Sequence, residues 1–173
     1  LYMDQVTSFM DEQLSSSKRY DDDKILTKTM INNYAKNNLL PPPVKKKYSK
    51  EHVIVMIFIY YFKTILSIKD IETILTPITE KYFGTDSAVD VASIYEEVCN
   101  TAKSQIQNLK DEVREAYETS QNTFNDMEGL SDSDREYLQL FSLISSLSFD
   151  VYAKKALIER IIDELPEPVR KKK

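Results

Sequence analysis

Apolar positions recur at helical spacing along most of this chain, and the segments between them are rich in proline, serine or aspartate. The first such pattern covers residues 1–14 and ends at a polar loop of residues 15–23. A second pattern begins at Thr27, which can serve as an N-cap, and ends by Asn38, just before three consecutive prolines. These signals predict two short helices joined by a long polar loop.

Serine residues mark the starts of the remaining helices. We predict helices over about residues 50–65, 67–78, 87–127 and 131–165, with caps at Ser49, Ser67, Ser87 and Ser131. Gly129 separates the last two, which are long enough to form a helical hairpin. Small or apolar residues alternate in steps of four and three along the first arm, at Val98, Ala102, Ile106, Leu109, Val113, Ala116 and Ser120. Such a seam is typical of coiled coils.

The pattern therefore predicts a mainly α protein with a head of residues 1–84 and a helical dimerisation or regulatory region of residues 85–173. Two glycines in the whole chain argue against an all-β fold and against a glycine-rich phosphate loop. The single cysteine, Cys99, excludes an internal disulfide and favours a reducing, cytoplasmic setting. The longest apolar run, Val53 to Phe62, falls short of the roughly 20 residues of a membrane span, so we interpret it as a core helix.

Charge along the chain is strongly uneven. The chain carries a formal net charge of -5, yet Lys24 to Lys50 contains seven lysines and no aspartate or glutamate. A compact cationic surface on an acidic protein indicates an anionic partner, of which double-stranded DNA fits this order of elements best.

A helical projection of Thr27 to Asn37 separates a core side from an outward side. Met30, Ile31 and Tyr34 face the core. The outward face and its flanks carry the candidate DNA-binding residues of this helix, which are Lys28, Thr29, Asn32, Asn33 and Lys36. Asparagine can pair with an adenine edge, and lysine can reach guanine or phosphate. Lys45, Lys46 and Lys47 form a cationic loop tip suited to the DNA backbone, unless both features are only solvated surface.

The same segments resemble the winged helix-turn-helix head of the MerR regulators. The resemblance covers about Leu1 to Leu75 and rests on Tyr34, the step Asn38–Pro41, the wing end Tyr48–Ser49 and the helix Ser67–Leu75. More closely, the chain is similar to a bacterial family catalogued as domain of unknown function 1836. The turn after the first helix carries an insertion, the wing lacks its usual glycine, and the family's arginines are replaced by Asn32, Asn33 and Lys36. The resemblance implies a MerR-like fold and DNA binding.

We expect a sequence-specific transcriptional regulator that forms a homodimer through its C-terminal helices. The alternative is a helical protein-interaction module that keeps the fold without binding DNA. No convergent catalytic set is present, because His52 is the only histidine, so we predict no enzyme activity and no metal or cofactor. Aromatic residues of the last helix could line an effector pocket, although packing explains them better; they are Tyr137, Phe141, Phe149 and Tyr152.

Overall fold

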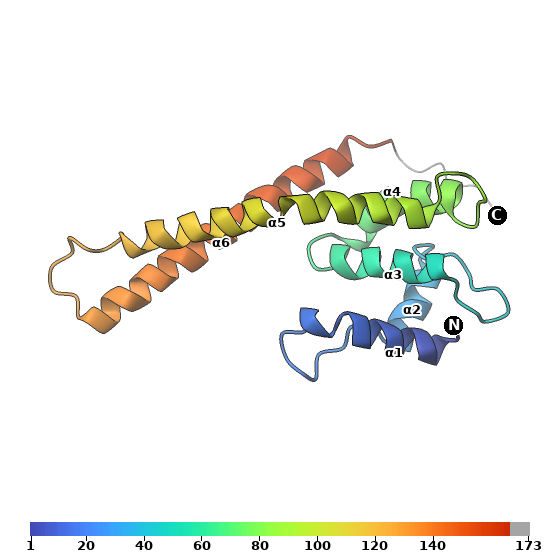
Figure 1. The fold of residues 1–173 in the computed structure, drawn as a ribbon, viewed down its shortest axis with the longest axis horizontal. Coiled ribbons are helices and arrows are strands. Elements are labelled where there is room, and N and C mark those ends of the chain that lie inside the picture. Colours follow the sequence, from blue (N-terminus) through green and yellow to red (C-terminus); the bar gives the residue numbers. More distant parts are fainter. Residues whose placement is uncertain (167–173) are drawn as a thin grey trace. The chain divides into compact units, whose positions relative to one another are not determined.

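The computed structural model describes residues 1–166, and these are mainly helical (Figure 1). The helices are α1 (Met3–Gln13), the short 3₁₀ helix η1 (Ser15–Ser17), α2 (Lys28–Lys36), α3 (Lys50–Phe62), α4 (Ile68–Tyr82), α5 (Val91–Gln121) and α6 (Asp132–Asp163). The prediction of a mainly α chain is confirmed. Among the described residues there is no β-strand, and the single isolated bridge pairs Val44 with Lys47.

The chain forms two compact units. The first, the head, contains Leu1–Glu97 together with residues 161–166, and the second, the hairpin, contains Val98–Arg160. The division into functional regions of residues 1–84 and 85–173 stays a prediction, and its last seven residues lie outside the described chain.

The core of the head is built around α3. Its apolar run is buried over Val53–Met56 and again at Ile59, which confirms the predicted core helix. Helices α1, α2 and α4 each contribute two buried residues: Val6 and Met10 from α1, Ile31 and Tyr34 from α2, and Ile71 and Leu75 from α4. No helix within residues 1–166 has the length and apolarity required to cross a membrane.

Side-chain caps fix most of the helix starts as predicted. The hydroxyl groups of Thr27, Ser49 and Ser67 accept hydrogen bonds from the first turns of α2, α3 and α4. The predicted cap at Ser87 is wrong, because its hydroxyl donates to the carbonyl of Val89 instead. Asp90 caps α5, accepting from Ser93 N at 2.7 Å while Asp90 N donates to Ser93 Oγ at 3.0 Å.

Two helix ends also differ from the prediction. Helix α4 continues past Ile78 to Tyr82 although Pro77 lies inside it. The hydroxyl of Thr79 donates to the carbonyls of Leu75 and Thr76, each at 3.2 Å, in the turn that follows the proline. Helix α5 ends at Gln121 rather than near Met127.

Side chains of α6 explain this early end of α5. Gln139 Nε2 lies within hydrogen-bonding distance of three oxygens at or just beyond the end of α5: Gln121 O at 2.9 Å, Thr123 O at 3.2 Å and Asn125 Oδ1 at 3.1 Å. Arg135 donates to the carbonyls of Phe124 and Met127. Because these groups satisfy the carbonyls of the turn, the reversal between the two arms of the hairpin is well defined.

Candidate nucleic-acid interface

Helix α2 presents a polar face to solvent. Ile31 and Tyr34 are buried, whereas the exposed side chains of this helix are Lys28, Thr29, Asn32, Asn33 and Lys36. Within the described chain, the side-chain amides of Asn32 and Asn33 form no hydrogen bond. The face therefore offers the uncommitted amides of Asn32 and Asn33 and the exposed ammonium group of Lys36.

The end of α2 turns the chain toward the prolines. Asn38 has a φ of 57°, and the amide of Leu39 donates to Tyr34 O at 2.9 Å. The amide of Asn38 donates to Ala35 O at 3.3 Å, which completes a Schellman motif. Asparagine tolerates this left-handed conformation better than most residues, which is why it can end the helix here. The buried Leu39 and Leu40 then anchor the segment that leads to the lysines.

The three consecutive lysines lie on a tight β-turn of residues Val44–Lys47, which we call the lysine turn. Lys47 N donates to Val44 O at 2.9 Å, and Lys45 and Lys46 have φ values of 49° and 63°. Positive φ at both central residues defines a type I′ turn, in which asparagine and glycine are strongly preferred. Two lysines there are strained, at a cost of roughly 1–2 kcal/mol each. All four side chains of the turn are exposed.

Residues 1–4, at the start of α1, contact both α2 and the lysine turn. The backbone of Leu1 and Tyr48 exchanges two hydrogen bonds, of 2.8 and 2.7 Å. The ring of Tyr2 lies 5.6 Å from Lys47 Nζ, a cation–π distance. Two residues further on, Asp4 forms an ion pair with Lys28. The start of α2 and the lysine turn therefore both adjoin the N-terminal turn of α1.

The ion pair with Asp4 is an interaction that the sequence did not predict. The segment Lys24 to Lys50 is free of acidic residues, but α1 brings a carboxylate to the start of α2. Residue spacing within one helix cannot reveal a partner that packs against it from another helix. Of the eight candidate side chains, Lys28 is thus partly neutralised, whereas Lys36 and the lysines of the turn have no acidic partner in the described chain.

His52 contacts Tyr48, the residue that follows the lysine turn. Its Nδ1 accepts from Ser49 N at 3.0 Å, while its ring meets Tyr48 and Phe83 edge-on at centroid distances of 5.4 and 4.7 Å. Nε2 is buried without a hydrogen-bond partner among the described residues. Burial lowers the pKa of His52 below its ordinary value, and the carbonyls of Pro42 and Pro41 act in the opposite direction. Burial of His52 therefore favours its neutral form in the folded head.

Lys63 fixes the segment that enters α2. Its Nζ donates to Ile25 O at 3.2 Å and lies 5.0 Å from the ring centroid of Tyr60. Burial lowers the pKa of this lysine. Lys63 ended the apolar run in the sequence, but its reach back to Ile25 depends on the packing of α3 and was not predictable from spacing.

Taken together, these elements define a helical head with an exposed cationic surface formed by α2 and a lysine turn. The family model described as Domain of unknown function (DUF1836) matches residues 1–98, and the chain belongs to this family. The match covers the head as far as Glu97 and extends beyond the Leu1–Leu75 segment that carried the resemblance. None of the curated proteins and none of the solved structures matches the chain.

Proposed function

We propose that the head binds double-stranded DNA in a sequence-specific manner and that the protein is a transcriptional regulator. One observation carries this proposal: residues at the start of the chain contact both the start of α2, whose polar face is exposed, and a strained turn of lysines. Strained backbone persists where function requires it, and two exposed lysines at positive φ contribute nothing to the core. Their charge favours contact with an anionic partner.

In this proposal α2 is the recognition helix. Asn32 and Asn33 can each donate to and accept from an adenine edge in the major groove, and Lys36 can reach guanine or phosphate. The lysine turn serves as a minimal wing that holds the phosphate backbone. The buried Tyr34 and the Schellman turn at Asn38 support a MerR-like arrangement of this helix and its exit. Because the described residues lack strands, the proposed wing is a turn rather than a sheet.

The wing is tested by the triple variant Lys45→Ala, Lys46→Ala, Lys47→Ala. We expect weaker binding to every duplex, and a salt dependence flatter by about 0.9 units of slope for each phosphate that the variant no longer neutralises. A mobility-shift assay over a range of salt concentrations measures both effects. The matched control removes three exposed cations elsewhere in the head, at Arg19, Lys69 and Lys81, and should leave the slope nearly unchanged.

Substitutions in the recognition helix should affect DNA binding differently from substitutions in the lysine turn. Replacing Asn32 or Asn33 with alanine should cost about 1–3 kcal/mol on a selected operator and relax the preference at one base position. The salt slope should stay close to that of the wild type, because the number of neutralised phosphates is the same. Helicity measured by circular dichroism should be unchanged, since both side chains are exposed.

These two experiments also distinguish DNA binding from the alternative function, a helical protein-interaction module that does not bind DNA. If the wing variant bound duplexes as tightly as the wild type at every salt concentration, the cationic surface would not be a DNA interface. The fold would then serve a protein partner. Loss of binding in the variant but not in the charge-matched control supports the DNA interface.

A further inference from the structure

The hairpin buries none of its own apolar side chains. Between Val98 and Arg160, all of which the structure describes, the buried residues are Ser120 and Gln139, and both are polar. Many large apolar side chains along both arms are about half exposed or more, including Ile106 at 48%, Leu109 at 56%, Phe149 at 71% and Leu157 at 58%. Monomeric proteins rarely expose such continuous apolar surface.

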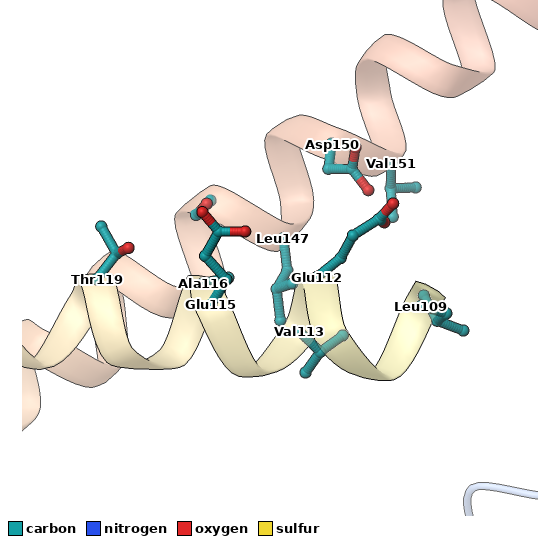
Figure 2. A pocket seen from close by; sticks show the side chains of 10 residues that line it. Leu109, Glu112, Val113, Glu115, Ala116, Thr119, Leu147, Asp150 and Val151 are labelled. Atoms are coloured by element: carbon teal, nitrogen blue, oxygen red, sulfur yellow. The ribbon is translucent and has the colours of Figure 1, made fainter. Parts of the chain in front are cut away.

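The hairpin is also prepared for docking. The hydrogen bonds of Gln139 and Arg135 already define the reversal between α5 and α6. Between the arms lies an open groove of about 470 Å³, with Leu109, Val113, Leu147 and Val151 among its lining residues (Figure 2). A partner that covers it meets a preformed surface, which lowers the entropic cost of association.

Charge along the hairpin identifies the partner. The tip, residues 111–149, holds nine acidic residues and two arginines, for a net charge of -7. The base, residues 98–110 and 150–160, holds five basic residues and two acidic ones, for a net charge of +3. A second hairpin lying antiparallel would place each acidic tip against a basic base, whereas a parallel one would bring two acidic tips together.

We propose that two copies of this chain pair through their hairpins in an antiparallel arrangement with twofold symmetry. In such a pair the acidic tip of each hairpin faces the basic base of the other, so the same contact forms twice, as an isologous interface requires. A different protein would need the same bipolar pattern, whereas a second copy has it by construction. The apolar stripes, centred near Leu109 and Val113, form the core of the interface. This inference does not depend on DNA binding, and its tests use no DNA.

Light scattering of the intact chain measures the stoichiometry. At tens of micromolar the protein should have twice the 20.1 kDa mass of one chain. The double variant Leu109→Ser, Val113→Ser should shift the protein toward the monomer, whereas the control Ile68→Ser, Val89→Ser, which alters exposed apolar residues of the head, should not. A monomeric wild type, or equal effects of the two variants, would overturn the proposal.

Charge reversal tests the orientation. Glu115→Lys with Glu118→Lys makes the tip less acidic and should weaken the dimer about tenfold at low salt. Lys103→Glu with Lys110→Glu alters the base and should weaken it similarly. In a parallel pair the tip variant would instead reduce the repulsion between two acidic tips and strengthen the dimer. If the tip variant strengthens the dimer, the antiparallel arrangement is wrong.

If a charge-reversed variant fails to fold, a distance measurement still tests the orientation of the two hairpins. Spin labels at Met127→Cys, in a Cys99→Ser background, report the separation of the two tips. In an antiparallel pair the tips lie roughly 35 Å apart or more, the length of the 24-residue arm Val98–Gln121 at about 1.5 Å per residue. A separation below about 20 Å would mean a parallel pair and would overturn the proposal.

Discussion

At the scale of single residues, Asp4 is the group that most limits the cationic surface. Its carboxylate pairs with Lys28 at the start of α2, where both side chains are exposed. We predict that Asp4→Asn frees Lys28 for a phosphate, tightens binding to every duplex severalfold and raises the salt slope by about 0.9. Fluorescence anisotropy with a labelled duplex over a range of salt concentrations measures both quantities.

The control for this variant is Asp86→Asn, which removes an equal charge from another exposed position of the head. It should change the affinity only slightly, because long-range electrostatics are screened at physiological salt. If both variants tighten binding equally, the ion pair has no specific role and net charge alone accounts for the effect.

His52 links the stability of the head to pH. Burial lowers its pKa in the folded state, so the unfolded chain binds the extra proton more readily. The free energy of unfolding is therefore independent of His52 above the unfolded pKa of about 6.5, and it decreases as pH falls below that value until the folded protein also takes up the proton, at no more than about 1.4 kcal/mol per pH unit. We predict that the free energy of unfolding decreases as pH falls below about 6.5.

The variant His52→Gln tests this cause. Glutamine at the third helical position can still accept from Ser49 N, as histidine does here, but it cannot take up a proton. Urea denaturation at several pH values should give a flatter dependence for the variant, even if its stability at pH 7 is lower. An unchanged dependence would show that other groups control it.

At the scale of elements, the lysine turn holds two positive charges in a strained backbone conformation that lowers the stability of the head. We predict that Lys45→Asn with Lys46→Gly relieves the positive φ angles and raises the free energy of unfolding by about 0.5–2 kcal/mol. The same variant should bind all duplexes more weakly, since two cations are removed. Thermal denaturation and anisotropy on one preparation check the pair of effects, and a variant that is both less stable and weaker would contradict the account.

The elements that sequence could predict are those whose signals are local. The caps at Thr27, Ser49 and Ser67 and the buried α3 follow from residue type and spacing alone. The cap at Asp90 was missed because Ser87 offered an equivalent pattern three residues earlier. The end of α5 depends on Gln139, which is eighteen residues away along the chain, and spacing holds no information about such an interaction.

The candidate site shows the same limit. Which side chains of α2 are exposed follows from a helical projection, and the three lysines are visible in the sequence. Their turn type, the ion pair with Asp4 and the support from His52 arise where separate segments pack together. Residue identity indicates that a cationic surface exists, while its electrostatics depend on tertiary packing.

At the scale of the whole molecule, two separate proposals meet. The head supplies one recognition helix, and the hairpin supplies the surface through which a second copy would bring another. A twofold-symmetric dimer with two such helices would recognise two inverted half-sites, as symmetric DNA-binding dimers do. The operator of this protein is therefore expected to be a pseudo-palindrome.

Selection of binding sites from random duplexes tests the central proposal of sequence-specific DNA binding most directly. The intact chain is incubated with the duplex pool near physiological salt, bound DNA is recovered over several rounds, and the enriched sequences are footprinted. We predict one motif of two inverted half-sites containing adenine positions that Asn32 and Asn33 read, with protection of both halves. If folded protein enriched no motif over the starting pool, the proposed function would be contradicted.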